Sequence, residues 1–327
     1  MTDGEVATTL GIQHFQHLNA SQQAQLFWKP PEVISLHDEP RLIATALGAT
    51  LYIPADRPDL AATVTRRASE GICSMVLDLE DAVDDMHADA AMHNVVTALD
   101  ELAADPLATM VFVRVRSYDC IPQIADRLTV GAHALAGFVI PKFEADTGAR
   151  YLRQTEDAAS ALSRHLYCMP VLESERILFQ ETRDAELTAL VDLLDEHRQT
   201  VLAVRVGATD MCGSLGIRRD RDHTIYDVKV VADVLAAIIN RFGRPDGTGF
   251  VVTAPVWEYF ADHERLFRPL LRATPFRDHD AVRFRDMLVS RDLDGLLREI
   301  SLDRANGLLG KTIIHPTHAA PVHALSV

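Results

Sequence analysis

Two acidic residues, Glu173 and Asp210, each end a run of apolar and β-branched residues that is typical of a buried strand. We predict that the two runs are neighbouring parallel strands, which would place both carboxylates at strand tips on the same side of the sheet. Such a pair can share one hard divalent cation and leave its other positions to water and substrate oxygens, as Mg²⁺ prefers. Both residues are therefore predicted metal ligands. The alternative is that they cap helices or pair with Arg176 and Arg205.

A second acidic group lies in the run VLDLED. Asp78 and Glu80 are two residues apart, so both side chains leave the same face of a strand, and Asp81 leaves the other. Buried carboxylates need cationic partners, because an unpaired buried charge is very unfavourable. An ion-pair network that holds the strand ends together and a catalytic acid pair are equally consistent with these residues.

Basic side chains also gather near the predicted strand ends, although the chain has 47 acidic and 32 basic residues and a formal net charge of −15. They are Arg57, Arg114, Arg116, Lys142, Arg218 and Arg219. Guanidinium groups pair with carboxylates and phosphates through two parallel hydrogen bonds, so this pattern predicts a small anionic substrate. Taken alone, the run RRDRD at 218–222 is better explained as a solvated loop of alternating charge.

Eight short strand-like runs must position these residues. They lie at 50–54, 74–80, 110–116, 137–143, 167–173, 203–210, 249–257 and 310–316, with helix-like segments such as 89–103 between them. Polar residues follow many different runs rather than one switch point, and no GxGxxG or P-loop sequence follows any run. The pattern predicts an α/β fold, a (β/α)₈ TIM barrel with one active-site mouth, over an open doubly wound sheet.

Two segments do not fit the repeat. Residues 1–46 are predicted to be an N-terminal extension that packs on the barrel or on a neighbouring subunit, so the TIM-barrel domain would span 47–327. Residues 258–303 are longer than one crossover helix needs, and we expect an insertion or lid before the last strand.

Composition narrows the class of protein further. No long basic run offers a surface for nucleic acid or an anionic membrane, and no apolar stretch is long enough to span a bilayer. The start of the chain lacks the pattern of a signal peptide, and four widely spaced cysteines predict reduced thiols. We therefore expect a soluble, cytoplasmic protein. His315 and His318 are predicted to be structural or substrate-contacting rather than zinc ligands, because Pro316 argues against a helix there.

Seven motifs occur in the order found in citrate lyase beta-subunit-like proteins of the HpcH/HpaI aldolase superfamily. They are LYIPADRP, MVLDLEDAV, VFVRVRS, FVIPKFEA, VLESERIL, VGATDMCGSLGI and GKTIIHPTH. The resemblance runs from about Leu51 to the C-terminal end. The extension and the sequences ALGATLYIPADRP and GIRRDRDHTIYD more specifically resemble the subgroup of carbon–carbon bond lyases of the TIM-barrel fold. Members of that subgroup tend to be encoded with tellurium-resistance-associated genes.

The resemblance implies an aldol- or Claisen-type lyase that passes through a metal-stabilised enolate of a small carboxylic acid or of its thioester, including a CoA thioester. Glu173 and Asp210 match the family's Mg²⁺ ligands. Arg114 matches the arginine that contacts the substrate carbonyl or carboxylate. The resemblance also implies a homo-oligomer, a trimer or a multiple of it.

Other positions carry over as well. Glu80 with Asp81 match the acidic pair of the DLEDAV motif, where proton transfer to or from the substrate hydroxyl would be expected. Lys142 matches the lysine of the LPK motif. His315 and Pro316 match a C-terminal pair to which we assign no role.

Three positions depart from the family pattern. Arg116 replaces the usual asparagine of VRVN, Thr209 replaces the glutamate before the metal-binding aspartate, and PGNRP reads PADRP. The added charge of Arg116 beside Arg114 predicts a more anionic or phosphorylated substrate, with Arg57 and Lys142 as further substrate-binding residues. Two alternatives remain open: an altered small-molecule-binding relative in a stress-response system of the tellurium-resistance type, and an enzyme that handles pyruvate or phosphoenolpyruvate.

Overall fold

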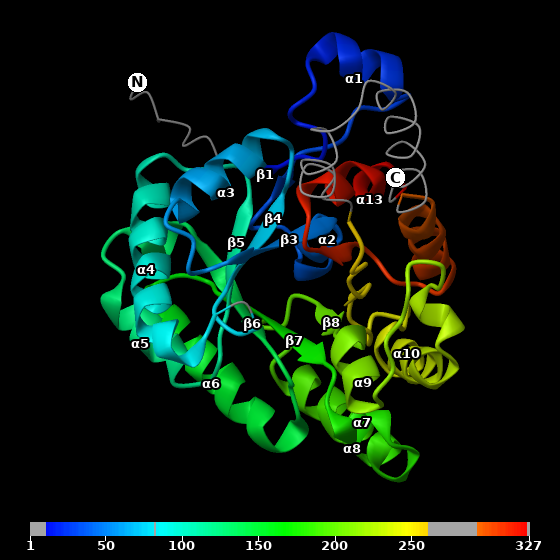
Figure 1. Cartoon of the computed structure of the whole chain (residues 1–327). Helices are drawn as coiled ribbons and strands as arrows, with labels where there is room; N and C mark the ends of the chain where they lie inside the picture. Colours follow the sequence, from blue (N-terminus) through cyan, green and yellow to red (C-terminus); the bar gives the residue numbers. More distant parts are fainter. Residues whose placement is uncertain (1–10, 82, 261–292, 326–327) are drawn as a thin grey trace, which may run out of the picture.

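Eight parallel strands form the centre of the molecule (Figure 1). A computed structural model describes residues 11–81, 83–260 and 293–325. The strands are β3 (Ala49–Pro54), β4 (Ser74–Asp78), β5 (Met110–Arg114), β6 (Leu135–Ile140), β7 (Tyr167–Leu172), β8 (Val204–Val206), β9 (Val252–Thr253) and β10 (Lys311–Ile313). They pair in the order β10-β3-β4-β5-β6-β7-β8-β9, and a parallel bridge between Ala254 and Lys311 joins the two edges. The predicted (β/α)₈ barrel is confirmed, with all eight predicted runs contributing a strand.

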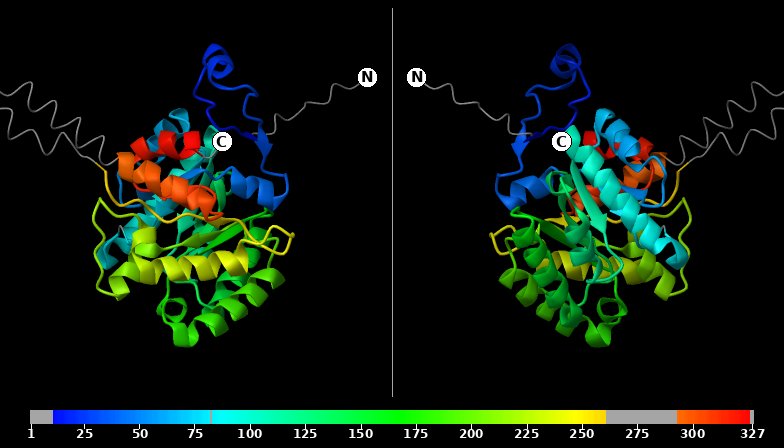
Figure 2. Two further views of the ribbon diagram at one scale, coloured as in Figure 1. Left: turned by 90° about the vertical axis from the view of Figure 1, so that its right-hand side faces the viewer. Right: turned by 90° about the vertical axis from the view of Figure 1, so that its left-hand side faces the viewer.

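Helices surround the strands, as the two side views in Figure 2 show. They are α3 (Leu60–Ser69), α4 (Ala88–Ala104), α5 (Cys120–Arg127), α6 (Ala145–Ala161), α7 (Glu175–Leu178), α8 (Gln180–Glu196), α9 (Ala208–Ser214), α10 (Lys229–Phe242), a helix at 293–305 and α13 (Ala319–Leu325). In α4, Val95, Leu99 and Leu102 recur at helical spacing and are all buried, so that one face packs on the strands. None of the helices in the described ranges is both long and apolar enough to cross a membrane.

Alternating strand residues build two apolar layers. Val76 and Phe112 belong to a cluster inside the barrel, whereas their neighbours Leu77 and Val113 belong to the cluster between strands and helices. All four are buried completely. The alternation follows from the two-residue repeat of a strand, which sends successive side chains to opposite faces.

The N-terminal segment covers the end of the barrel where the strands begin. It contains β1 (Gly11–Ile12), α1 (Ala20–Leu26), β2 (Ile34–Ser35) and α2 (Pro40–Thr45). Ile12, Ile43 and Leu47 join the interior cluster and fill this end with apolar side chains. In contrast, α1 buries none of its residues and stands apart from the barrel in Figures 1 and 2. The domain boundary after residue 46 stays a prediction.

The helix at 293–305 is attached to the barrel by buried charges, which we call the helix network: Arg219, Glu299, Asp303 and Lys311. The Lys311 ammonium lies 2.9 Å from a Glu299 oxygen and 2.8 Å from an Asp303 oxygen, and Arg219 pairs with Glu299. All four side chains are buried, and each has an opposite charge beside it. Most of the segment for which a lid is expected, 261–292, lies outside the described residues.

Candidate functional site

A cavity of about 240 Å³ opens at the carboxyl ends of the strands. Four predicted site residues line it, namely Asp81, Arg114, Glu173 and Asp210. They come from β5 and from the segments that follow β4, β7 and β8. Residues far apart in the chain thus converge on one mouth, as the barrel topology predicts.

Glu173 and Asp210 reach this cavity from different kinds of element. Glu173 directly follows β7, whereas β8 ends at Val206 and Asp210 lies in the first turn of α9. The prediction that Asp210 lies at a strand tip is therefore wrong, because the chain leaves the strand at Gly207 and turns into a helix. A side chain at Gly207 would overlap the Glu173 carboxylate, since an added Cβ would lie 1.7 Å from Oε2. The glycine makes room for that carboxylate.

The two carboxylates fit a hard cation. Burial, followed by the negative charge of Asp210, raises the pKa of Glu173 to about 8, so the pair needs more positive charge than the ammonium of Lys142, 3.1 Å from Asp210, supplies. A divalent cation would supply that charge, and oxygen donors are the ligands Mg²⁺ prefers. Within the ranges the structure describes, no group of three or more His, Cys, Asp or Glu side chains could hold a metal. A cation here would therefore have two protein carboxylates and complete its shell with other oxygens.

Lys142 connects both carboxylates to Glu80. Its backbone N–H donates to Glu173 Oε1 at 2.9 Å, while its ammonium lies 2.6 Å from Glu80 Oε1 and 3.1 Å from Asp210 Oδ2. The residue adopts a φ of 48°, a left-handed conformation that is unfavourable for a side chain of this kind. Burial alone would lower the pKa of Lys142, but its bonds to Glu80 and Asp210 raise it above the usual value. The left-handed backbone of Lys142 thus allows its amide to bond Glu173 while its ammonium reaches Glu80 and Asp210.

Arg114 forms ion pairs with three acids, one at the end of β4 and two directly after it. It forms two parallel hydrogen bonds of 2.6 Å with Asp78, its register partner on β4. Nη1 lies 2.9 Å from Glu80 Oε2 and 3.0 Å from Asp81 Oδ2. The side chain of Asp81 is more than half exposed, whereas that of Glu80 is largely buried and its pKa is raised by burial against the opposing charge of Arg114.

Two predicted substrate-binding residues lie apart from this group. The Arg57 guanidinium is exposed and lies 3.2 Å from Asp59. Arg116 pairs with Asp85 and donates to the Val83 carbonyl at 3.2 Å, and both residues lie between β4 and α4. Neither arginine lines the cavity.

Sequence reasoning missed three residues that do line it: Tyr52, Arg205 and Glu258. Thr209 donates its hydroxyl to Glu258 at 2.5 Å, so a carboxylate from the segment after β9 lies beside the position where the family pattern has a glutamate. Arg205 could have been recognised, because it is a charged residue in the middle of a buried strand-like run. Arg205 bonds neither Glu173 nor Asp210, and the ion pairs of Arg176 are with Glu144, Asp146 and Glu186, so the alternative pairing does not occur.

His315 and His318 do not form a metal pair. His315 accepts a hydrogen bond from Thr317 at the start of a short 3₁₀ helix (Pro316–His318), and its ring stacks on Phe260. The His318 ring is buried, and this burial lowers its pKa to about 4. These contacts favour the predicted structural role.

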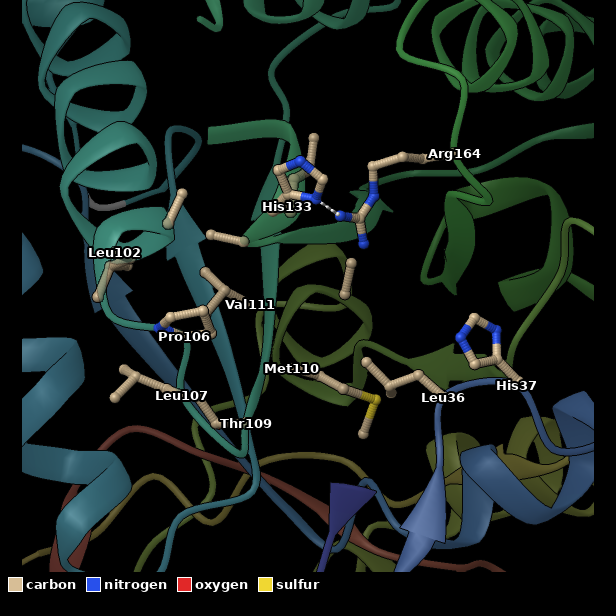
Figure 3. Close-up of a pocket in the computed structure, with 14 residues that line it drawn as sticks. Leu36, His37, Leu102, Pro106, Leu107, Thr109, Met110, Val111, His133 and Arg164 are labelled. Carbon is tan, nitrogen blue, oxygen red and sulfur yellow. Dashed lines mark hydrogen bonds between the residues drawn. The ribbon is translucent and has the colours of Figure 1, made fainter. Parts of the chain in front are cut away.

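A larger cavity, about 590 Å³, lies at the opposite end of the barrel (Figure 3). Its wall is mostly apolar, with Leu36, Leu102, Leu107 and Met110 among the labelled side chains. A 2.9 Å hydrogen bond joins His133 and Arg164 at its rim. Among the described residues that line it there is no carboxylate, so it offers no acid pair.

Comparisons with known proteins concern the family and the fold of this chain. A family model described as "C-C_Bond_Lyase of the TIM-Barrel fold" matches residues 41–327. A citrate lyase subunit beta-like protein of Deinococcus radiodurans is 39% identical over 111 residues, 33% of this chain and 37% of that protein. The match therefore spans little more than a third of the relative's length.

Solved structures resemble this one in fold. The citrate lyase beta subunit of M. tuberculosis, in complex with oxaloacetate and magnesium, is 19% identical with a TM-score of 0.54, over 86% of this chain and 98% of the other. Haloferax volcanii malate synthase in a lead(II) complex is 15% identical with a TM-score of 0.60, over 89% and 74% of the two chains. RipC of Yersinia pestis is 15% identical with a TM-score of 0.55, over 87% and 96%. At these identities the likeness concerns the fold alone.

Proposed function

The chain belongs to the family of carbon–carbon bond lyases of the TIM-barrel fold, and we propose that it makes or breaks a carbon–carbon bond next to a carboxylate with Mg²⁺ held by Glu173 and Asp210. One observation carries this proposal. Two carboxylates, one directly after β7 and one in the first turn of α9, share a small cavity with Arg114, and burial together with the negative charge of Asp210 raises the pKa of Glu173.

Each protein group has a task in this proposal. Bound Mg²⁺ would supply Lewis-acid stabilisation of the negative charge that develops on an enolate. Arg114 is fixed by Asp78 and presents a permanent positive charge to the cavity, where a preorganised charge is most effective. Lys142 holds Glu173 and Asp210 in position through its amide and ammonium.

We assign different roles to Glu80 and Asp81. Asp81 lines the cavity, so it is the group placed to move a proton to or from the substrate hydroxyl. Glu80 does not line it and bonds Lys142 and Arg114 instead, which makes it a positioning residue.

The substrate we propose is a small carboxylic acid. At about 240 Å³ the cavity is smaller than the roughly 300–1,000 Å³ of sites for drug-sized ligands. The CoA portion of a thioester would have to lie outside it. M. tuberculosis relatives of this fold have been solved with oxaloacetate, acetoacetate or pyruvate, and these acids are the first candidates here.

Enolate formation can be tested without knowing the second reactant. In D₂O with Mg²⁺, the protein should catalyse deuterium exchange at the carbon next to the carbonyl of pyruvate or acetoacetate, followed by NMR. EDTA should abolish the exchange. Metal-dependent binding of these acids with no exchange above the buffer rate would contradict the lyase proposal and favour the altered small-molecule-binding relative.

We also propose a homo-oligomer of the cytoplasm. Leu26, Trp28 and Val33 of the extension are exposed apolar side chains on one segment, which suits a contact with a second copy. Light scattering after size-exclusion chromatography would measure the mass. A strictly monomeric protein at micromolar concentration would contradict the oligomer.

A further inference from the structure

Arg205 is a buried arginine that crosses the interior of the barrel. It belongs to β8 and is only 1% exposed. Nη2 donates to the Thr312 hydroxyl at 2.5 Å, and Nη1 lies 3.4 Å from the Thr50 hydroxyl. These threonines belong to β10 and β3, neither of which is next to β8 in the sheet.

The positive charge of Arg205 has no acidic partner among the described residues. Its contacts are neutral hydroxyls and the Met169 sulfur, and its Nε has no hydrogen-bond partner. A buried guanidinium without a counter-charge is unfavourable, whereas the equally buried Arg219 has Glu299 beside it. Among the described residues, the guanidinium of Arg205 therefore lacks a carboxylate within ion-pairing distance.

Arg205 also lines the cavity that contains Glu173 and Arg114. It pairs in register with Val171, two residues before Glu173, so it lies one interior layer below the proposed metal ligand. The guanidinium carbons of Arg114 and Arg205 lie 5.1 and 5.6 Å from the centroid of the same Tyr52 ring. The cavity thus has one cation at its mouth and a second at its floor.

We propose that Arg205 binds a second carboxylate of the substrate, so that this site selects an acid with two anionic ends. The inference rests on the proposed lyase function and deepens it. One end would lie near Glu173, Asp210 and Arg114, and the other would pair with the guanidinium of Arg205 beside Thr312. Arg205 then supplies the selectivity for a more anionic substrate that sequence reasoning assigned to Arg116, which pairs with Asp85 and does not line the cavity.

A matched pair of ligands tests this directly. Oxaloacetate and 2-oxobutyrate share the 2-oxo acid end and differ only in a terminal carboxylate or methyl group. With Mg²⁺ present, calorimetry on the wild type should show oxaloacetate binding at least about tenfold more tightly. Arg205→Met should remove this preference and leave 2-oxobutyrate affinity within about twofold, whereas the control Arg116→Met should preserve it.

Two further measurements separate ligand binding from a structural role. Arg205→Lys serves as the second variant if Arg205→Met proves poorly folded. It keeps the positive charge but loses the planar guanidinium, so it should retain part of the preference for oxaloacetate. In EDTA, malonate should raise the Tm of the wild type and not that of Arg205→Met. The Tm of Arg205→Met without ligand should equal or exceed the wild-type value, because an unpaired buried charge is removed.

The possible failures are distinguishable. If folded Arg205→Met keeps the preference, weakens both acids equally, or responds to malonate as the wild type does, the role assigned to Arg205 is overturned. If neither 2-oxo acid binds the wild type with Mg²⁺, the proposed function fails instead, and a wild-type response to malonate that the variant lacks would still support an anion site at Arg205.

Discussion

Two networks of charged side chains occupy neighbouring parts of the barrel and differ in their balance. In the helix network, two cations face two carboxylates, and each charge has its opposite within the network. The mouth network consists of Asp78, Glu80, Asp81, Glu173 and Asp210 with Arg114 and Lys142. There, five carboxylates share two cations. A balanced network can serve stability by itself, whereas an unbalanced one indicates that a charge from outside the chain completes it.

Removing one cation from the helix network should have the largest effect on stability. Lys311→Met leaves Glu299 and Asp303 buried beside an apolar side chain, and we expect the free energy of unfolding to fall by about 3–5 kcal/mol. Urea denaturation measures this. The control Lys29→Met removes an exposed ion pair and should cost no more than about 1 kcal/mol. Equal effects of the two substitutions would show that the helix network is not a stabilising element.

Removing an acid from the mouth network should instead damage activity. We expect Glu173→Gln to lower Mg²⁺-dependent exchange by about 10²- to 10³-fold, equivalent to about 3–4 kcal/mol of transition-state stabilisation. Its Tm should not fall, because the substitution relieves repulsion from Asp210. Glu175→Gln, two residues further on and exposed, is the matched control. Unchanged metal affinity in Glu173→Gln, measured by calorimetry, would contradict the metal assignment.

We expect the helix network to make the free energy of unfolding depend on pH. Burial raises the pKa of Asp303 from 3.8 to about 6 in spite of Lys311, and Glu299 adds to the increase. Between these values the folded protein binds a proton that the unfolded chain has lost. The contribution of Asp303 is therefore present below pH 4 and is lost as pH rises through 6, on the order of 1–3 kcal/mol.

The direction in which Asp303 changes the free energy of unfolding with pH can be measured by urea denaturation from pH 4 to 7. Relative to Asp303→Asn, the wild type should lose stability as the pH rises. The variant Asp294→Asn, with an exposed acid on the same helix, should follow the wild type. A wild type that gains stability over Asp303→Asn in this range would reverse the inferred sign.

The smallest effects belong to the arginines outside both networks. Arg57→Gln and Arg116→Gln remove groups whose acidic partners are Asp59 and Asp85, neither of which lines the cavity. We expect less than about threefold change in KM or kcat and less than about 1 kcal/mol in stability. A tenfold rise in KM for either variant would bring that arginine back into the substrate site.

The features that could be predicted from the sequence are those set by the alternation of side chains along a strand. All eight strands were placed, and Arg114 was identified as a partner of the acids in the second strand because register follows the two-residue repeat. The two-residue repeat no longer predicts the direction of a side chain once the strand has ended. β5 stops at Arg114, so the alternation no longer directs Arg116, and Gly207 turns the chain into a helix before Asp210.

Other features depend on contacts that no local pattern contains. Glu258 lies beside Thr209 although 49 residues separate them in the chain. The balance of charge around Lys311 depends on the helix at 293–305. The lack of a counter-charge at Arg205 among the described residues is visible only once every neighbouring strand is in place.

Ile12, Ile43 and Leu47 fill the far end of the barrel with buried apolar side chains, so within the part of the chain that the structure describes a bound molecule would leave through the mouth. A reaction that splits one molecule into two would then release its fragments in sequence, the shallow one before the one seated on Arg205. Steady-state inhibition by each fragment would reveal this: the last to depart should compete with substrate, and the first should not. A random departure order would mean that a second way out exists.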